Sequence, residues 1–321
     1  MRPLRNRKGV VLILVLSMVA LFTAMIVAFS ADESLDIELA YNFRDSVQAQ
    51  YIARGGVEAA LAILSEDDAG HDSLDEQWAQ FAEYAASASA YLEGAQLSGG
   101  ISDESGRIDL NSLAKNDGNR EFRVEQFKRL FTLLRIDIND DELNDLVNAI
   151  IDWIDADSET ELGAEDEYYQ TLEPPYHCKN APLDSIEELL LIKGMKREFL
   201  TGTENYEGIR NFVTVGTDGK ININTASETV LQTLSDEIGE DVVSSILDCR
   251  PFQSADYGCV RGLDLAGGTP ESTWIRNTLE VKSRRFAVEV KSVMPSGAQV
   301  NVRAELERIN NKPRIVYYRI H

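Results

Sequence analysis

The residues of this sequence best suited to chemistry are the carboxylates between Asp155 and Glu167. Seven acidic side chains lie within these 13 residues. Crowded carboxylates repel one another unless a cation neutralises them, and Ca²⁺ binds roughly six to eight hard oxygen ligands. The spacing approaches an EF-hand loop without matching it, because Thr160 replaces the glycine and Asp166 replaces the final glutamate. On the residues alone, a solvated acidic loop is the simpler interpretation.

The histidines and cysteines indicate little catalytic chemistry. Cys249 and Cys259 lie ten residues apart in a loop-like stretch and could form a disulfide in an oxidising compartment, with Cys178 left over. His177 precedes Cys178, but adjacent side chains do not easily face one zinc ion, and no second pair has finger spacing. The sequence has no Ser-His-Asp grouping and no phosphate-binding glycine loop. We therefore do not expect an enzyme.

The stretch from Lys220 to Arg250 resembles a helix-hairpin-helix DNA-binding unit, and Pro182–Leu200 resembles another in part. Such hairpins hold DNA phosphates with backbone amides. The hairpin Ser235–Asp241 instead carries four carboxylates, and the whole chain has a net charge of −23. Binding a polyanion there is electrostatically unfavourable. We expect these hairpins to be packing modules and predict no nucleic-acid partner.

The elements that position these residues begin with an apolar N-terminal helix. Val10–Phe29 is 20 residues long and contains no charge, Gly or Pro. As a helix it would span about 30 Å, the thickness of a bilayer's hydrocarbon core. Four cations precede it and acidic residues follow, which predicts a cytoplasmic N-terminus and export of the rest. A cleavable secretory signal is the alternative, with a small-residue site at Ala28–Ala31, but the helical pattern continues to Leu64.

The start of the chain resembles the class III signal of type IV pilins and pseudopilins. That resemblance rests on a short basic leader ending in Lys8-Gly9 and followed by the apolar helix from Val10. It implies that a prepilin peptidase cuts after Gly9 and leaves Val10 as the first mature residue. Most members carry Glu at the fifth mature position, where this chain has Leu14. This departure favours the K-type minor pseudopilin of type II secretion, which typically lacks that Glu.

A second resemblance to the K-type family lies in the acidic region. The matching segments, in order along the chain, are Asp152–Asp157, Gly163–Tyr169, Leu172–Tyr176 and the later motif Gly219–Thr225. Characterised members bind Ca²⁺ in an inserted helical domain, so the resemblance implies a structural calcium ion. The ligands it implies in this chain are Asp155, Asp157, Glu161, Glu165 and Asp166.

Periodicity predicts most of the remaining elements. Helices are expected over Ser73–Tyr91, with Trp78, Phe81 and Tyr84 buried, and also over Phe127–Leu134, Leu143–Ile154 and Ser185–Leu191. Two short strands are expected in Leu97–Leu110, around a turn at 103–106, and a three-stranded antiparallel meander from 284 to 320, with a turn at 295–297. The early strands most simply join that meander in one sheet packed on the N-terminal helix.

The predicted fold class is α+β, a pilin-like fold with a large inserted helical domain, which matches the K-type pseudopilins. The predicted divisions are a leader (1–9), a transmembrane helix half (10–29), a first pilin-like part (30–110), the inserted helical domain with the acidic loop (111–279) and a second pilin-like part (280–321).

The resemblance implies a minor pseudopilin at the tip of the type II secretion pseudopilus. Its expected partners are the I- and J-type minor pseudopilins, the major pseudopilin, the inner-membrane assembly platform, the prepilin peptidase and the membrane. The expected location is the cell inner membrane, crossed once, with most of the chain in the periplasm. A minor pilin of a type IV pilus and, more remotely, a helix-hairpin-helix DNA-binding protein remain alternatives.

Overall fold

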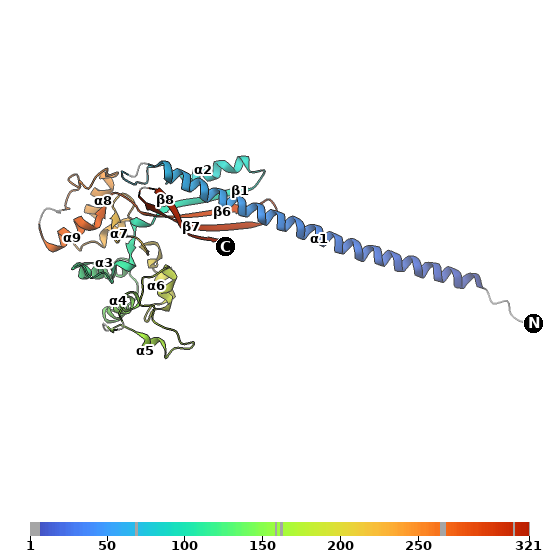
Figure 1. The fold of residues 1–321 in the computed structure, drawn as a ribbon, viewed down its shortest axis with the longest axis horizontal. Coiled ribbons are helices and arrows are strands. Elements are labelled where there is room, and N and C mark those ends of the chain that lie inside the picture. The colour runs from blue at the N-terminus through green and yellow to red at the C-terminus, as the bar shows by residue number, and fades with distance from the viewer. Residues whose placement is uncertain are drawn as a thin grey trace, which may run out of the picture.

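The computed structural model describes residues 7–67, 70–157, 159–160, 163–263, 268–310 and 312–320. Its longest element is α1 (Arg7–Glu66), a continuous helix of 60 residues that extends far beyond the rest of the protein (Figure 1). By length and composition the segment Gly9–Ser30 can cross a membrane, and none of it is buried by other parts of the chain. This half of α1 is therefore compatible with a single-pass membrane anchor.

The second half of α1 packs on a four-stranded antiparallel sheet whose strand order is β1-β6-β7-β8. Its strands are β1 (Gln96–Asp103), β6 (Arg285–Val293), β7 (Gln299–Ile309) and β8 (Lys312–Ile320). Helix residues that face the sheet are small or apolar, among them Ala53, Val57, Ala60 and Leu64. A Cβ on Gly56 would lie 2.8 Å from a methyl of Val290, so glycine lets the helix approach β6 closely.

The predicted meander is confirmed. Residues 295–297 connect β6 to β7, and the register pairs Phe286 with Leu306 and Val290 with Val302. Because opposite residues in a sheet share a face, these side chains form one apolar layer against α1. Trp78 closes the end of this layer, with its ring centroid 5.3 Å from that of Phe286.

The segment after α1 differs from the predicted helix over Ser73–Tyr91. Only α2 (Phe81–Ala88) and a 3-10 turn η1 (Ser89–Tyr91) are helical, and the residues before them form turns. The Glu76 carboxylate accepts hydrogen bonds from the Ser73 amide and the Trp78 indole, which fixes a turn and buries Trp78. Tyr84, expected to be buried, is 45% exposed.

The second early strand does not join the sheet, contrary to the prediction. After β1 the chain forms a 3-10 turn, η2 (Glu104–Gly106), in which the Asp103 side chain accepts from the Ser105 amide at 2.7 Å. This turn carries the chain away from β6. The short strand β2 (Ile108–Asp109) then pairs in parallel with β3 (Val213–Thr214) inside the helical region.

The chain between β1 and β6 builds a second unit, the inserted domain, which lies beyond the C-terminal end of α1 (Figure 1). Its helices and remaining short strands are η3 (Leu110–Ser112), α3 (Arg120–Leu133), α4 (Asp140–Ile154), α5 (Asp166–Tyr169), η4 (Ile186–Leu191), α6 (Arg197–Thr201), η5 (Ile209–Asn211), β4 (Ile221–Asn222), α7 (Glu228–Gln232), α8 (Glu240–Cys249), α9 (Pro270–Thr278) and β5 (Leu279–Glu280). It has its own apolar core, separate from the core beneath α1.

Between these two cores lies a polar junction, which we define as Asp72, Asp103, Asn222, Ser283 and Arg308. Its centre is the Asn222 amide nitrogen, which donates to the Asp103 carboxylate at 3.1 Å, the Ser283 hydroxyl at 2.7 Å and the Asp72 carbonyl at 3.0 Å. The Ser283 amide donates to Asp72 Oδ2 at 2.7 Å. The guanidinium of Arg308, on β7, pairs with the Asp72 carboxylate. These bonds tie β4 of the inserted domain to the start and the end of the pilin-like domain.

Candidate functional site

The acidic loop begins where α4 ends, and α4 positions its first carboxylates. Asn139 caps the helix start by accepting from the Glu142 amide at 2.9 Å, and apolar residues bury one face of the helix as predicted. Near the other end Asp152 is wholly buried, next to Trp153, whose ring lies 5.1 Å from that of Tyr169. The sequence therefore fixes a carboxylate inside the domain, at the base of the loop.

The loop returns to α4 at Gly163. A Cβ at this position would lie 2.5 Å from Asp152 Oδ2 and 2.6 Å from the Ala149 amide nitrogen, so a side chain here would displace the loop. Lys193 donates to the Gly163 carbonyl at 3.2 Å and holds the return segment from outside. Glycine is thus needed to bring the second group of carboxylates against the helix.

Glu165 is the most unusual residue of this group. It is 5% exposed, and neither carboxylate oxygen receives a well-oriented hydrogen bond from the described residues. Burial raises the pKa of Glu165, the neighbouring thiol of Cys178 and amide of Asn180 oppose that rise, and the Asp152 carboxylate adds to it. Glu165, whose carboxylate oxygens lack well-oriented donors among the described residues, and the neighbouring buried carboxylate of Asp152 form a donor set that suits a hard cation.

The other predicted ligands lie at different depths in the loop. Asp155 ends α4 and has one buried carboxylate oxygen. Asp157 is exposed and accepts from the Glu159 amide at 2.9 Å, which shapes a local turn. Glu161 lies outside the described residues.

Asp166 is the predicted ligand that the structure turns outward. Its carboxylate contacts His177 Nδ1 at 2.9 Å and accepts from the Cys178 amide at 2.6 Å. These two hydrogen bonds lower the pKa of Asp166. Of the predicted ligands, Glu165 and one oxygen of Asp155 are thus buried near the end of α4. Asp157 and Asp166 lie at the surface.

Two residues of this region were not in the predicted set. Asp152 precedes Asp155 by three residues, which is one helical turn, so the signature itself contained a signal for it. Asn180 lies beyond the double proline, and its amide donates to the Asp157 carbonyl at 2.5 Å. Nothing in sequence spacing links it to the loop, because the contact depends on how the chain folds back.

The cysteines have structural roles in the described fold. Cys178 is buried, with its sulfur 3.7 Å from the Asp152 carbonyl, and burial raises the pKa of the thiol to about 12. Such a thiol remains protonated and is a poor metal ligand or nucleophile. Cys249 and Cys259 form a disulfide in the structure, with Cα atoms 6.3 Å apart. The geometry is thus compatible with the predicted pairing in an oxidising compartment.

The hairpin that resembles a DNA-binding unit is anchored to α3, while its carboxylates are exposed. It lies between α7 and α8, and its Asp236 carboxylate pairs with Arg129 of α3 at 2.8 Å. The same guanidinium donates to the carbonyls of Thr233 and Leu234, each at 3.3 Å. The exposed surface of this hairpin is therefore acidic, which disfavours contact with phosphates.

The remaining feature of interest is the start of α1. Gly9 and Val10 already belong to the helix, and residues 1–6 of the leader lie outside the described residues. Leu14 is exposed, like the residues around it. A long helix whose first half touches nothing and whose second half packs on an antiparallel sheet is the arrangement that the pilin-like prediction requires.

Comparison with known proteins identifies this arrangement. The family model described as "Type II secretion system (T2SS), protein K" matches residues 106–216. The type II secretion system protein K of Pseudomonas aeruginosa is 31% identical over 266 residues, which cover 78% of this chain and 76% of that protein. The chain belongs to the type II secretion system protein K family.

Other relatives and one solved structure agree with this membership. A putative type II secretion system protein K of Escherichia coli K12 is 28% identical over 234 residues, 70% of this chain and 67% of that protein. A chain of the crystal structure of the GspK-GspI-GspJ complex from enterotoxigenic Escherichia coli aligns with a TM-score of 0.66 and 19% identity, covering 87% of this chain and 97% of that chain. This chain shares the α+β fold of that solved chain, and α1 gives it a long N-terminal helix.

Proposed function

We propose that this chain is a minor pseudopilin that initiates and caps the type II secretion pseudopilus. The exposed apolar half of α1 carries this proposal. An apolar helix of 22 residues with no intramolecular contacts, joined without a break to a packed helix, fits first a bilayer and then a bundle of similar helices. In this proposal the N-terminus lies in the cytoplasm, the helix crosses the inner membrane and the remaining chain is periplasmic.

Two observations favour the tip over a repeated position in the filament. The inserted domain projects beyond the C-terminal end of α1 and to one side of the sheet (Figure 1). It would therefore collide with a further subunit added to the filament at that end. Leu14 also replaces the glutamate that other pilins carry at the fifth mature position, thought to pair with the N-terminus of a neighbouring subunit. A subunit that is assembled first has less need of such a partner.

The proposed direct partners are the I- and J-type minor pseudopilins. The solved structure with the same fold comes from a complex of GspK, GspI and GspJ. Residues 33–321 should be monomeric alone and form a complex with one copy each of the periplasmic parts of the I- and J-type subunits. Within residues 1–32 the structure describes Gly9–Ser30 as fully unburied, so removing this part of α1 removes no buried contact.

Size-exclusion chromatography with light scattering tests this assignment directly. A ternary mass equal to the sum of one copy of each chain supports the tip role. Homopolymeric filaments of the full-length protein alone, or no association with either subunit, would contradict it. The type IV minor-pilin alternative requires assembly with pilins instead, and membership of the protein K family does not favour it.

The acidic loop leads to a second proposal, that the inserted domain holds a structural calcium ion. Its support is the fit of the residues: Glu165 offers two buried oxygens without well-oriented donors, next to the buried carboxylate of Asp152. Asp155 adds one buried oxygen at the end of α4, and Asp157, Glu161 and Asp166 remain candidate ligands from the predicted set. Bound calcium would supply the positive charge that these carboxylates otherwise lack.

Calcium should therefore raise the melting temperature of residues 33–321 by several degrees relative to excess chelator. A ligand that binds only the folded state stabilises it by RT ln(1 + [L]/Kd), about 2.7 kcal/mol at a hundredfold excess over Kd. Glu165→Gln should abolish the difference, whereas Asp145→Asn, an exposed carboxylate on α4, should retain it. Differential scanning calorimetry measures both. Equal melting with and without calcium would favour a solvated loop.

A further inference from the structure

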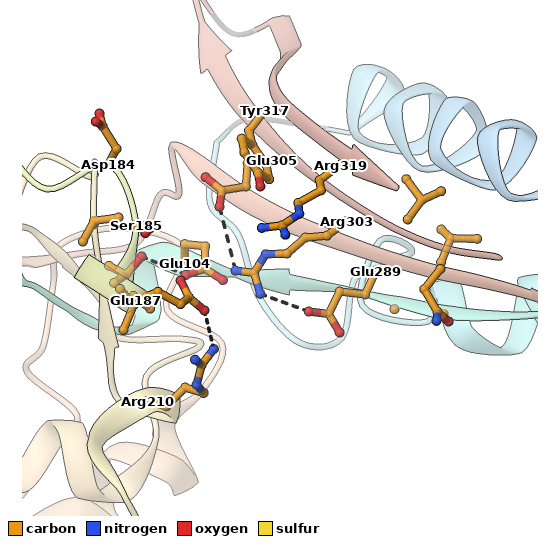
Figure 2. Close-up of a pocket in the computed structure, with 18 of the residues that line it drawn as sticks. Glu104, Asp184, Ser185, Glu187, Arg210, Glu289, Arg303, Glu305, Tyr317 and Arg319 are labelled. Carbon is orange, nitrogen blue, oxygen red and sulfur yellow. Dashed lines mark hydrogen bonds and ion pairs between the residues drawn. The ribbon is translucent and has the colours of Figure 1, made fainter. Parts of the chain in front are cut away.

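A groove of about 970 Å³ lies between the outer face of the sheet, opposite α1, and the inserted domain. Figure 2 shows the side chains of β7 and β8 on one side of it, and Glu187 with Arg210 on the other. The groove is open to solvent, and nine of its 19 lining residues are charged. It is separate from both the acidic loop and the exposed half of α1.

The groove is lined by five carboxylates and four cations, and their ion pairs are unevenly distributed. All five lining carboxylates have a cationic partner: Glu104 with Arg107 at 3.0 Å, Asp184 with Lys179 at 2.8 Å, Glu187 with Arg210 at 2.9 Å, Glu289 with Arg303 at 3.1 Å and Glu305 with Arg285 at 2.5 Å. By contrast, Lys291 and Arg319 pair with no carboxylate among the described residues. Two of the four lining cations are therefore left without an ion-pair partner in the part of the chain that the structure describes.

Arg319 is the cation of this groove with the least favourable surroundings. The register sets it directly opposite Arg303 on β7, and Figure 2 shows the two guanidiniums side by side. Like charges at directly opposite positions destabilise a sheet. Arg303 is compensated by Glu289, but Arg319 is not. An external carboxylate would remove this repulsion.

Arg319 belongs to a strand with a free edge. In the described part of the sheet β8 is the last strand, so the backbone N–H and C=O groups on its outer side have no ladder partner. It also contains no acidic residue, and its cations Lys312 and Arg314 form no ion pair with the residues that the structure describes. Five of its apolar or aromatic side chains are between 38% and 45% exposed: Ile315, Val316, Tyr317, Tyr318 and Ile320.

The two faces of β8 differ in chemistry. Tyr317 and Arg319 pair with Glu305 and Arg303 and line the groove. Tyr318 and Ile320 pair with Ala304 and Val302, whose side chains belong to the apolar core under α1. An additional strand along this edge would therefore meet positive charge on one face and apolar side chains on the other.

Edge strands often carry lysine, proline or a bulge that prevents unwanted pairing. Here these devices are confined to the first half of β8, which has Lys312, Pro313 and a register shift opposite Glu305/Leu306. Beyond the shift, Tyr317–Ile320 pairs regularly with β7 and contains no such device except the charge of Arg319. The second half of β8 thus remains able to pair with another strand.

We propose that the free edge of β8 binds an extended segment of another protein by strand addition. The segment alternates acidic and apolar residues, so that a carboxylate reaches Arg319 on the groove face while apolar side chains cover Tyr318 and Ile320. Backbone hydrogen bonds to the edge supply affinity and the alternation supplies specificity. This inference goes beyond the tip assignment and does not depend on it.

The probe is a fluorescent synthetic peptide of alternating glutamate and valine, as long as β8, with an alternating lysine and valine peptide as its control. Both are titrated into the full-length protein in detergent micelles and followed by anisotropy, and hydrogen exchange is measured on β8. We expect the glutamate peptide alone to bind, to weaken with added salt, and to slow amide exchange in 317–320.

Arg319→Glu should weaken this binding by about tenfold or more, because it replaces a charge-assisted hydrogen bond with repulsion. Arg276→Glu is the matched control, an exposed arginine on α9 with the same charge change, and it should bind like the unchanged protein. The proposal fails if no peptide binds, if both peptides bind equally, if exchange in β8 is unaffected, or if both variants weaken binding alike. Self-association of the protein through β8 would also overturn it, by making a second copy the occupant.

Discussion

Replacing Arg308 by methionine should lower the free energy of unfolding of residues 33–321 by about 3–5 kcal/mol, the usual effect of removing one partner of a buried ion pair. The Arg308 side chain is 5% exposed and pairs with Asp72, which is wholly buried, and with Asp67 at 2.5 Å. Without the guanidinium the Asp72 charge remains inside the protein with only hydrogen bonds to stabilise it. Urea unfolding followed by circular dichroism measures the difference.

The effect should depend on pH because Asp72 titrates. Burial raises the pKa of Asp72 to about 6, against the opposing influence of Arg308, so removing Arg308 raises it further. A carboxyl whose pKa is higher in the folded than in the unfolded state favours folding most at low pH, and this contribution is lost as pH rises through the folded pKa. The variant should therefore be most destabilised near neutral pH and approach the unchanged protein at about pH 5.

Two variants separate the buried pair from a general loss of charge. Arg284→Met removes an arginine whose side chain is 65% exposed, although it pairs with Asp218 at 3.2 Å, and should cost about 1 kcal/mol or less. Combining Asp72→Asn with Arg308→Met removes the uncompensated charge and should recover much of the lost stability. If Arg308→Met alone behaves like Arg284→Met, the junction does not contribute as we describe.

The parts of the fold that the sequence predicted have strong local periodicity. Helix α4 has apolar residues at helical spacing and an asparagine cap, and the meander has alternating strands separated by a Pro-Ser-Gly turn. Each of these patterns specifies which face is buried within a single element. Knowing the buried face of each element is enough to predict the packing when elements that are adjacent in space are also consecutive in the sequence.

What escaped prediction depends on contacts between distant residues. Ile108 pairs with Val213 instead of joining the main sheet, and Asn222 connects Asp103 to Ser283 inside the polar junction. Periodicity indicates that a residue is buried. It does not indicate which other residue forms a hydrogen bond with a buried polar group. The acidic loop shows the same limit, because Asn180 reaches the Asp157 carbonyl only where the chain folds back, and no spacing in the sequence indicates that contact.

The second large expected effect concerns the start of α1. Gly9→Val should leave the precursor uncut, so that the protein retains Arg2, Arg5, Arg7 and Lys8 and fails to enter the pseudopilus. The proposed prepilin peptidase acts between Gly9 and Val10, where a β-branched side chain would crowd the scissile peptide. Intact-mass measurement on inner membranes distinguishes the precursor from a mature chain that begins at Val10.

The fold itself supplies the control for this experiment. A Cβ on either Gly9 or Gly55 would meet no atom within 4 Å, so α1 has room for valine at both positions. Gly55→Val should consequently be processed normally, and any defect specific to Gly9→Val then arises from the peptidase and not from folding. A mature chain that begins near Ala31, in either variant or in the unchanged protein, would mean a secretory signal peptide and would contradict the pseudopilin anchor.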